Sequence, residues 1–164
     1  MIFEYAFRKT GMTRKHKFIE TIKELIQLHV DRVVLYQEAL STLLRPDRKD
    51  LKPIFGEMIS GSIQFQQELK GSIAGLNGKM DGWDNEYKGA IYEVWESTRA
   101  PLVGSSSKSI LETCEQECEA VQQAYQAALS FSEPMDAATE QLLRMQQANL
   151  REIQDEIREY HDAL

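Results

Sequence analysis

The sequence has 164 residues, which is enough for one domain with its own hydrophobic core and without disulfides or metals to stabilise it. The net charge of −7 and the sequence pI of about 5.1 argue against a nucleic-acid partner, because binding to phosphates depends on clustered lysine and arginine. No apolar run approaches the roughly 18 residues of a membrane span and no apolar leader is visible, so we expect a cytoplasmic protein without a membrane span.

The first long helix is predicted over about residues 13–44, where inward positions recur at spacings of three and four residues. These positions are Ile19, Ile22, Ile26, His29, Val33, Tyr36, Leu40 and Leu43. Pro46 should end the helix, because proline cannot donate a backbone hydrogen bond. Residues 1–12 come before it, and we expect an N-terminal extension that can be disordered, so that residues 13–164 form a single domain.

A second helix should follow, with Asp47 as its cap and Pro53 in its first turn. Its inward positions are Leu51, Phe55, Met58, Ser62, Phe65, Leu69 and Ile73. Gly75, Asn77 and Gly78 should end it.

Residues 76–106 interrupt the helical pattern with glycines, a proline and three consecutive serines. We predict a long connection that contains a short helix. Its aromatic residues Trp83, Tyr92 and Trp95 either clamp the connection onto the other helices or form an exposed recognition patch.

Two further helices complete the chain. The serine run at 105–107 should cap the third, which ends near Ser132, and Pro134 should open the fourth. The inward positions of the third are Leu111, Cys114, Cys118, Val121, Tyr125 and Ala128, and those of the fourth are Leu143, Gln146, Leu150, Ile153, Ile157, Tyr160 and Leu164. The fold class is therefore all-α, and one long crossover between helices 2 and 3 is typical of a ferritin-like four-helix bundle.

A di-iron site in such a bundle takes a Glu from each of two helices and a Glu-x-x-His motif from each of the other two. None of the three histidines, His16, His29 and His161, follows a Glu by three positions. The predicted inward faces contain no Asp or Glu, which predicts a core without paired carboxylates. Since no set of nucleophilic residues is recognisable either, we expect no enzyme, no cofactor and no resident metal.

Five small or neutral polar residues do fall on the inward faces: His29, Ser62, Cys114, Cys118 and Gln146. The first interpretation is a core role. A neutral His or Gln can be satisfied by one or two buried hydrogen bonds, Ser can bond to its own helix, and a buried free Cys packs as a small apolar group.

The alternative is a mononuclear zinc or copper site built from Cys114, Cys118 and His29, because thiolates four residues apart on a helix can share one ion. Glu115 and Glu119 flank the two cysteines and would be the further candidate ligands. A thiol redox role is a third interpretation. The four-residue spacing does not fit a disulfide framework, which agrees with a reducing compartment.

Several stretches of the chain together form a pattern that resembles a known family. They are residues 50–60, 66–69, 91–92 with Trp95, 110–115, 124–125 with 128–129, and 155–157. They resemble an uncharacterised bacterial ferritin-like family, domain-of-unknown-function family 2383, over about residues 18–164. The resemblance implies a ferritin-like four-helix bundle with a short extra helix in the crossover, and it implies no settled activity.

The resemblance also implies where relatives carry potential metal ligands. Glu often stands at the positions of Val34 and Cys118, and His at those of Ile63 and Gln154. All four ligands are replaced here, so the resemblance implies a bundle that is kept for its shape rather than for iron.

We therefore expect a non-enzymatic binding or assembly module that forms a homo-oligomer. The alternative is a metal-binding protein, with a degenerate di-iron or Cys/His site, in metal storage or oxidative stress. A small apolar ligand between the helices, covered by the crossover, is a third hypothesis.

Overall fold

The structure is a computed structural model that describes residues 14–43, 50–76, 87–102, 104, 106–130 and 136–164. These residues form four long helices, α2 (Arg14–Thr42), α3 (Lys52–Gly75), α5 (Ser107–Leu129) and α6 (Ala137–Asp162), and one short helix, α4 (Ala90–Thr98). The described residues contain no strand, so the prediction of an all-α fold is confirmed. The predicted N-terminal extension, Asp47, Trp83 and Pro134 lie outside the described residues.

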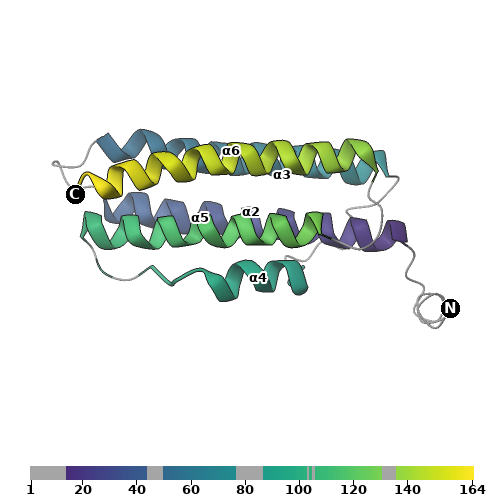
Figure 1. Ribbon diagram of the computed structural model, residues 1–164, viewed down its shortest axis with the longest axis horizontal. Coiled ribbons are helices and arrows are strands. Elements are labelled where there is room, and N and C mark those ends of the chain that lie inside the picture. Colours follow the sequence, from purple (N-terminus) through teal and green to yellow (C-terminus); the bar gives the residue numbers. More distant parts are fainter. Residues whose placement is uncertain (1–13, 44–49, 77–86, 103, 105, 131–135) are drawn as a thin grey trace.

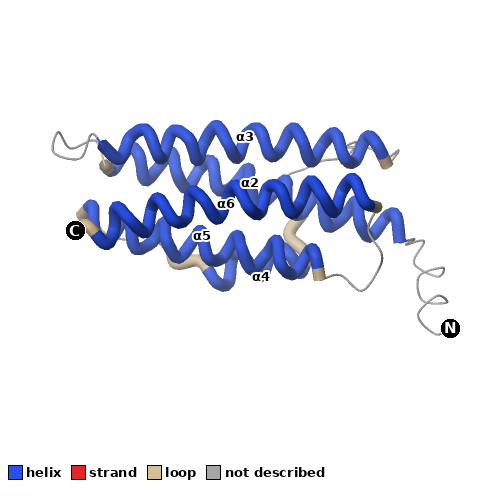
Figure 2. Tube along the Cα trace, turned by 45° about the horizontal axis from the view of Figure 1, so that its top comes forward, coloured by secondary structure: helices blue, strands red, loops and turns tan. Residues whose placement is uncertain are grey.

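The four long helices lie side by side as a bundle (Figure 1). α3 runs antiparallel to α2, and α6 runs antiparallel to α5, whereas α3 and α5 point the same way. The most extensive contacts join α2 to α3 and α5 to α6. The chain must therefore return along the bundle between α3 and α5, and α4 lies on this return path, packed against α5 and α2 (Figure 2).

Side-chain caps fix the starts of two helices. The Ser106 hydroxyl accepts the backbone N–H of Ser109 at 3.1 Å, which confirms the serine run as the cap of α5. At the start of α6, Asp136 is the cap and accepts the N–H of Thr139 at 3.1 Å, whereas Pro134, which was predicted to open this helix, lies outside the described residues.

The inside of the bundle holds two apolar clusters. One surrounds Leu25, Leu69 and Tyr125, and the other surrounds Tyr36, Phe55 and Cys114. Leu164, predicted to point inward, is 53% exposed, because α6 ends two residues before it. Among the described residues, no helix is both long and apolar enough to cross a membrane.

The buried side of α2 is wider than the predicted inward face, and α4 is the reason. Leu28 and Leu35 are buried although they lie off that face. The Glu24 carboxylate of α2 accepts the N–H groups of Ile91 and Tyr92, at 3.0 and 3.2 Å, at the start of α4. A negative charge there satisfies free N–H groups and complements the helix dipole, which fixes α4 against α2.

Gly89 leaves room for the Glu24 carboxylate at this junction. A Cβ atom added there would lie 2.6 Å from a carboxylate oxygen of Glu24. Burial raises the pKa of Glu24, although the backbone N–H groups of Tyr92, Ile91 and Gly89 act in the opposite direction.

Candidate functional site

A fully buried carboxylate, Glu117 of α5, lies inside the bundle. Its Oε2 accepts the Nε–H of Arg32 at 2.7 Å and the indole N–H of Trp95 at 2.7 Å. Its Oε1 accepts Nη2–H of Arg32 at 3.0 Å and the hydroxyl of Tyr36 at 2.5 Å. Four donors use about all the lone pairs that a carboxylate offers.

Every helix except α6 contributes to this cluster. Arg32 and Tyr36 come from α2 and Trp95 from α4, and Nη1–H of Arg32 donates to the Ser62 hydroxyl of α3 at 3.0 Å. Burial alone would lower the pKa of Arg32, but the Glu117 carboxylate raises it, so the guanidinium stays charged. We call Arg32, Tyr36, Ser62, Trp95 and Glu117 the central polar cluster.

The predicted inward faces missed one acidic residue, Glu117, which is fully buried. Glu117 belongs to a run of acidic residues, Glu112, Glu115, Glu117 and Glu119, and such a run is typical of a solvated helix face. However, Glu117 is three residues after Cys114 and four before Val121, both of which are buried. That spacing was the available signal, since three and four residues return to the same helix face.

A second buried network surrounds His29. The Tyr125 hydroxyl donates to Oε1 of Gln146 at 2.7 Å, and the amide group of Gln146 donates to the Phe65 carbonyl and to Glu68, at 3.4 and 3.2 Å. Because the Tyr125 proton is used in this way, Nε2 of His29, 2.7 Å from the hydroxyl, must be the donor of that pair. Its Nδ1 is then a bare acceptor, and it is buried without a hydrogen-bond partner among the described residues.

The His29 ring is held in a neutral form by its surroundings. Burial lowers the pKa of His29 well below its usual value, and the nearby Arg32 charge acts in the same direction. The ring packs edge-on against Phe65 and Tyr125, with centroids 5.3 and 5.9 Å apart. Ser62, Gln146 and His29 therefore have the core role that we expected for them.

The candidate Cys/His metal site is not assembled. Cys114 and Cys118 are buried free thiols, and Sγ of Cys118 lies 3.7 Å from the hydroxyl of Tyr36. His29 is seven residues from Tyr36 on α2, so it lies about 10 Å away along the helix. Burial raises the pKa of both thiols, that of Cys118 to about 12, which disfavours the thiolate that a metal would need.

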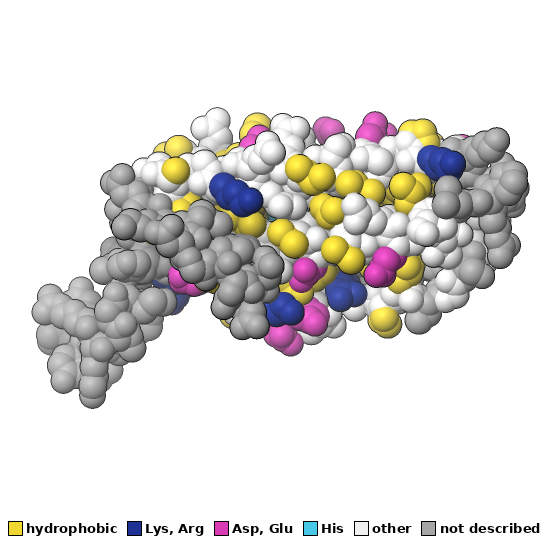
Figure 3. All heavy atoms as spheres, turned by 180° about the vertical axis from the view of Figure 1, so that it is seen from behind, with side chains coloured by type: hydrophobic (Ala, Val, Ile, Leu, Met, Phe, Trp, Pro, Cys, Tyr) yellow, Lys and Arg dark blue, Asp and Glu magenta, His cyan; other side chains and the backbone are white. Residues whose placement is uncertain are grey.

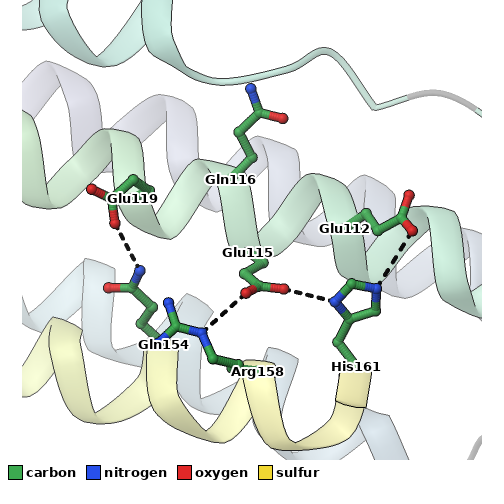
Figure 4. A pocket seen from close by; sticks show the side chains of 7 residues that line it. All are labelled: Glu112, Glu115, Gln116, Glu119, Gln154, Arg158 and His161. Atoms are coloured by element: carbon green, nitrogen blue, oxygen red, sulfur yellow. Dashed lines mark hydrogen bonds and ion pairs between the residues drawn. The ribbon is translucent and has the colours of Figure 1, made fainter. Parts of the chain in front are cut away.

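The two acidic candidates lie on the surface between α5 and α6 (Figure 4). Glu115 accepts from Arg158 at 3.1 Å and lies 2.7 Å from Nδ1 of His161, and Glu119 accepts from Gln154 at 3.1 Å. Partial burial raises the pKa of Glu115, but the hydrogen bonds from Arg158 and His161 lower it by more, so the pKa lies below its usual value. Among the described residues, no group of three or more His, Cys, Asp and Glu is arranged to hold a metal ion.

The four positions at which the resemblance implies ligands do not converge either. Cys118 and Gln154 are buried, whereas Val34 and Ile63 are 51% and 44% exposed on α2 and α3. Ligands on the outside of the bundle cannot share an ion with a ligand in its centre. In this chain the four positions therefore do not meet at one point.

No model of a known protein family matches the chain, and a search of curated proteins finds no significant match. Only the geometry therefore bears on what the central polar cluster does.

The central polar cluster gives Trp95 a testable role as an anchor of α4. Tyr92 and Trp95 are buried, as expected if the aromatic residues clamp this segment. Trp95→Phe keeps most of the apolar packing but removes one donor to Glu117. We expect it to lower the free energy of unfolding by about 1 to 3 kcal/mol, measured by urea denaturation.

The matched control is Tyr92→Phe on the same helix. Tyr92 donates its hydroxyl to Asp31, but it is nearer the surface, so we expect a smaller loss. Equal losses in the two variants would contradict the anchoring role of the indole N–H.

Proposed function

We propose that this chain is a non-enzymatic, ferritin-like helical bundle that acts as an assembly module by forming a homo-oligomer. The parallel direction of α3 and α5, with a long return path between them, supports the ferritin-like shape. The proposal depends mainly on one observation, an uncharged and partly apolar face along α2 and α3.

The centre of the bundle supports a non-enzymatic role. A di-iron centre needs carboxylates with free lone pairs, but all four donors around Glu117 are supplied by the protein itself. A guanidinium also occupies the space next to that carboxylate. These residues therefore do not fit iron.

The outer face of α3 carries few charges. No charged residue occurs between Met58 and Gln67, and Ile63 in this stretch is 44% exposed. Ile63 lies on the side of α3 away from Glu68, which reaches α6 through Gln146. Figure 3 shows apolar and uncharged side chains across the middle of this side of the molecule, with few charged ones among them.

The neighbouring face of α2 continues the surface. Val30, Val34 and Gln37 follow at spacings of four and three residues, and Val34 also lies beside Asp31 at the edge toward α4. We call this the α2/α3 face. Two copies of a chain with a charge of −7 repel each other, and an uncharged face is where that repulsion is weakest.

The size of the α2/α3 face suits a dimer. A helix of 24 residues is about 36 Å long, and two helices side by side are about 20 Å wide. The face therefore offers roughly 700 Å², close to the area of about 800 Å² that each partner buries in a standard interface.

Sedimentation equilibrium tests this proposal. We expect the wild-type chain to dimerise and Ile63→Glu to weaken the dimer at least tenfold, because a carboxylate would be buried in the interface on both copies. The matched control is Met145→Glu on α6, where an apolar side chain of similar exposure, 49%, is replaced away from the face. A wild-type chain that stays monomeric at millimolar concentration, or equal effects of the two variants, would contradict the proposal.

A further inference from the structure

A second surface feature, separate from the α2/α3 face apart from the shared Val34, is a hollow between α2, α4 and the segment that follows α4. It has a volume of about 420 Å³, within the range of small-molecule sites. Its lining includes Leu35, Tyr92, Arg99 and Leu102. It exists because α4 is held against α2 at its start, while the chain after it turns into an extended conformation at Arg99.

Arg99 is positioned in this hollow without an anion. Its guanidinium carbon lies 4.7 Å from the ring centroid of Trp95, which is itself fixed by its bond to Glu117. No described carboxylate lies within 4.0 Å of Arg99, and its buried Nε–H has no hydrogen-bond partner among the described residues. A stacked guanidinium presents a planar set of donors that suits a carboxylate.

The hollow also offers negative charge and apolar surface. Asp31 is already bonded, since it accepts from Gln27 and from the Tyr92 hydroxyl. Glu38 and Glu96 line the hollow, are exposed, and have no side-chain partner among the residues described. Leu35 and Leu102 provide apolar surface, and Val34 is half exposed beside them.

The hollow thus offers a guanidinium, free carboxylates and an apolar surface. A ligand that contacts all three carries a carboxylate, an ammonium group and an apolar side chain. An anion alone would be repelled by Glu38 and Glu96, and a cation alone would be repelled by Arg99 and Lys88. We propose that this hollow is a binding site for an apolar α-amino acid, with the carboxylate on Arg99, the ammonium group on Glu38 or Glu96, and the side chain against Leu35 and Leu102.

Titration of the full chain with L-leucine, followed by ¹H–¹⁵N NMR, tests the site. We expect saturable shifts at the Trp95 indole N–H and the Tyr92 amide. Leucinamide, which lacks the carboxylate, and 4-methylpentanoate, which lacks the ammonium group, should each bind at least tenfold more weakly. Glycine should also bind at least tenfold more weakly, because it has no apolar side chain.

Two variants locate the site. Arg99→Gln should weaken L-leucine binding at least tenfold, whereas Arg158→Gln, at an arginine that already has a carboxylate partner, should leave it unchanged. Glu38→Gln changes only an exposed side chain, so it tests the ammonium contact even if Arg99→Gln folds poorly. Shifts that do not saturate, binding that is unchanged in Arg99→Gln, or 4-methylpentanoate binding as tightly as L-leucine would each overturn the proposal.

Discussion

Glu117→Gln is expected to lower the free energy of unfolding by about 3 to 5 kcal/mol, although it hardly changes the shape of the side chain. The substitution leaves the Arg32 guanidinium charged and buried without a counter-ion. It also turns an amide group toward donors that need an acceptor, namely Arg32, Tyr36 and Trp95. Urea denaturation followed by circular dichroism measures the loss.

Glu115→Gln is the matched control, two residues away on α5. Glu115 also pairs with an arginine, but Arg158 is half exposed, so we expect a loss below about 1 kcal/mol. If Glu117→Gln lowered the free energy of unfolding no more than this control, burial would not be the reason why the central polar cluster stabilises the fold.

The double variant Arg32→Met with Glu117→Gln removes the unpaired charge. We expect it to recover most of the stability that Glu117→Gln loses, because the desolvation cost of the guanidinium disappears with it. Losses that simply add would contradict a direct coupling between the two side chains.

Because His29 is buried in its neutral form, we expect the free energy of unfolding to decrease in mild acid. Its pKa is lower in the folded chain than in the unfolded chain, where it is about 6.5, so the unfolded state binds a proton first. The full stability is therefore present above pH 6.5 and decreases as the pH falls. Between pH 6.5 and 5.5 we expect a loss of about 1 kcal/mol from this residue.

His29→Gln should flatten the pH dependence, since an amide can still donate to Tyr125 but does not titrate. His161→Gln is the control, because His161 lies on the surface between two carboxylates and is not buried. The comparison is between slopes against pH rather than between absolute stabilities. A His29→Gln slope equal to that of the wild type would show that the buried ring does not cause the loss.

The sequence was sufficient to predict the helices, because their apolar residues recur at spacings of three and four. All six inward positions predicted for the third helix, from Leu111 to Ala128, are buried. The errors came from contacts between helices distant in sequence. Leu28 and Leu35 lie on the side of α2 that packs against α4, and the spacing within α2 contains no information about a helix that begins only at Ala90.

The central polar cluster shows the same limit more sharply. Arg32 and Glu117 are 85 residues apart; Arg32 follows Asp31, and Glu117 lies in a run of acidic residues. Hydrophobicity treats a buried ion pair and two solvated charges alike, so only the three-dimensional contact distinguishes them. His29, Ser62 and Gln146 were easier to predict, because they interrupt apolar stripes that are otherwise continuous.

The return path between α3 and α5 has a consequence for how the chain folds. The α2–α3 and α5–α6 pairs are each joined by short connections, so their contacts can form locally and early. The bond between Arg32 and Glu117 joins one pair to the other, and it can form only when the two charges lose their water together. Docking of the two helix pairs, rather than formation of either pair, should therefore be the slow step.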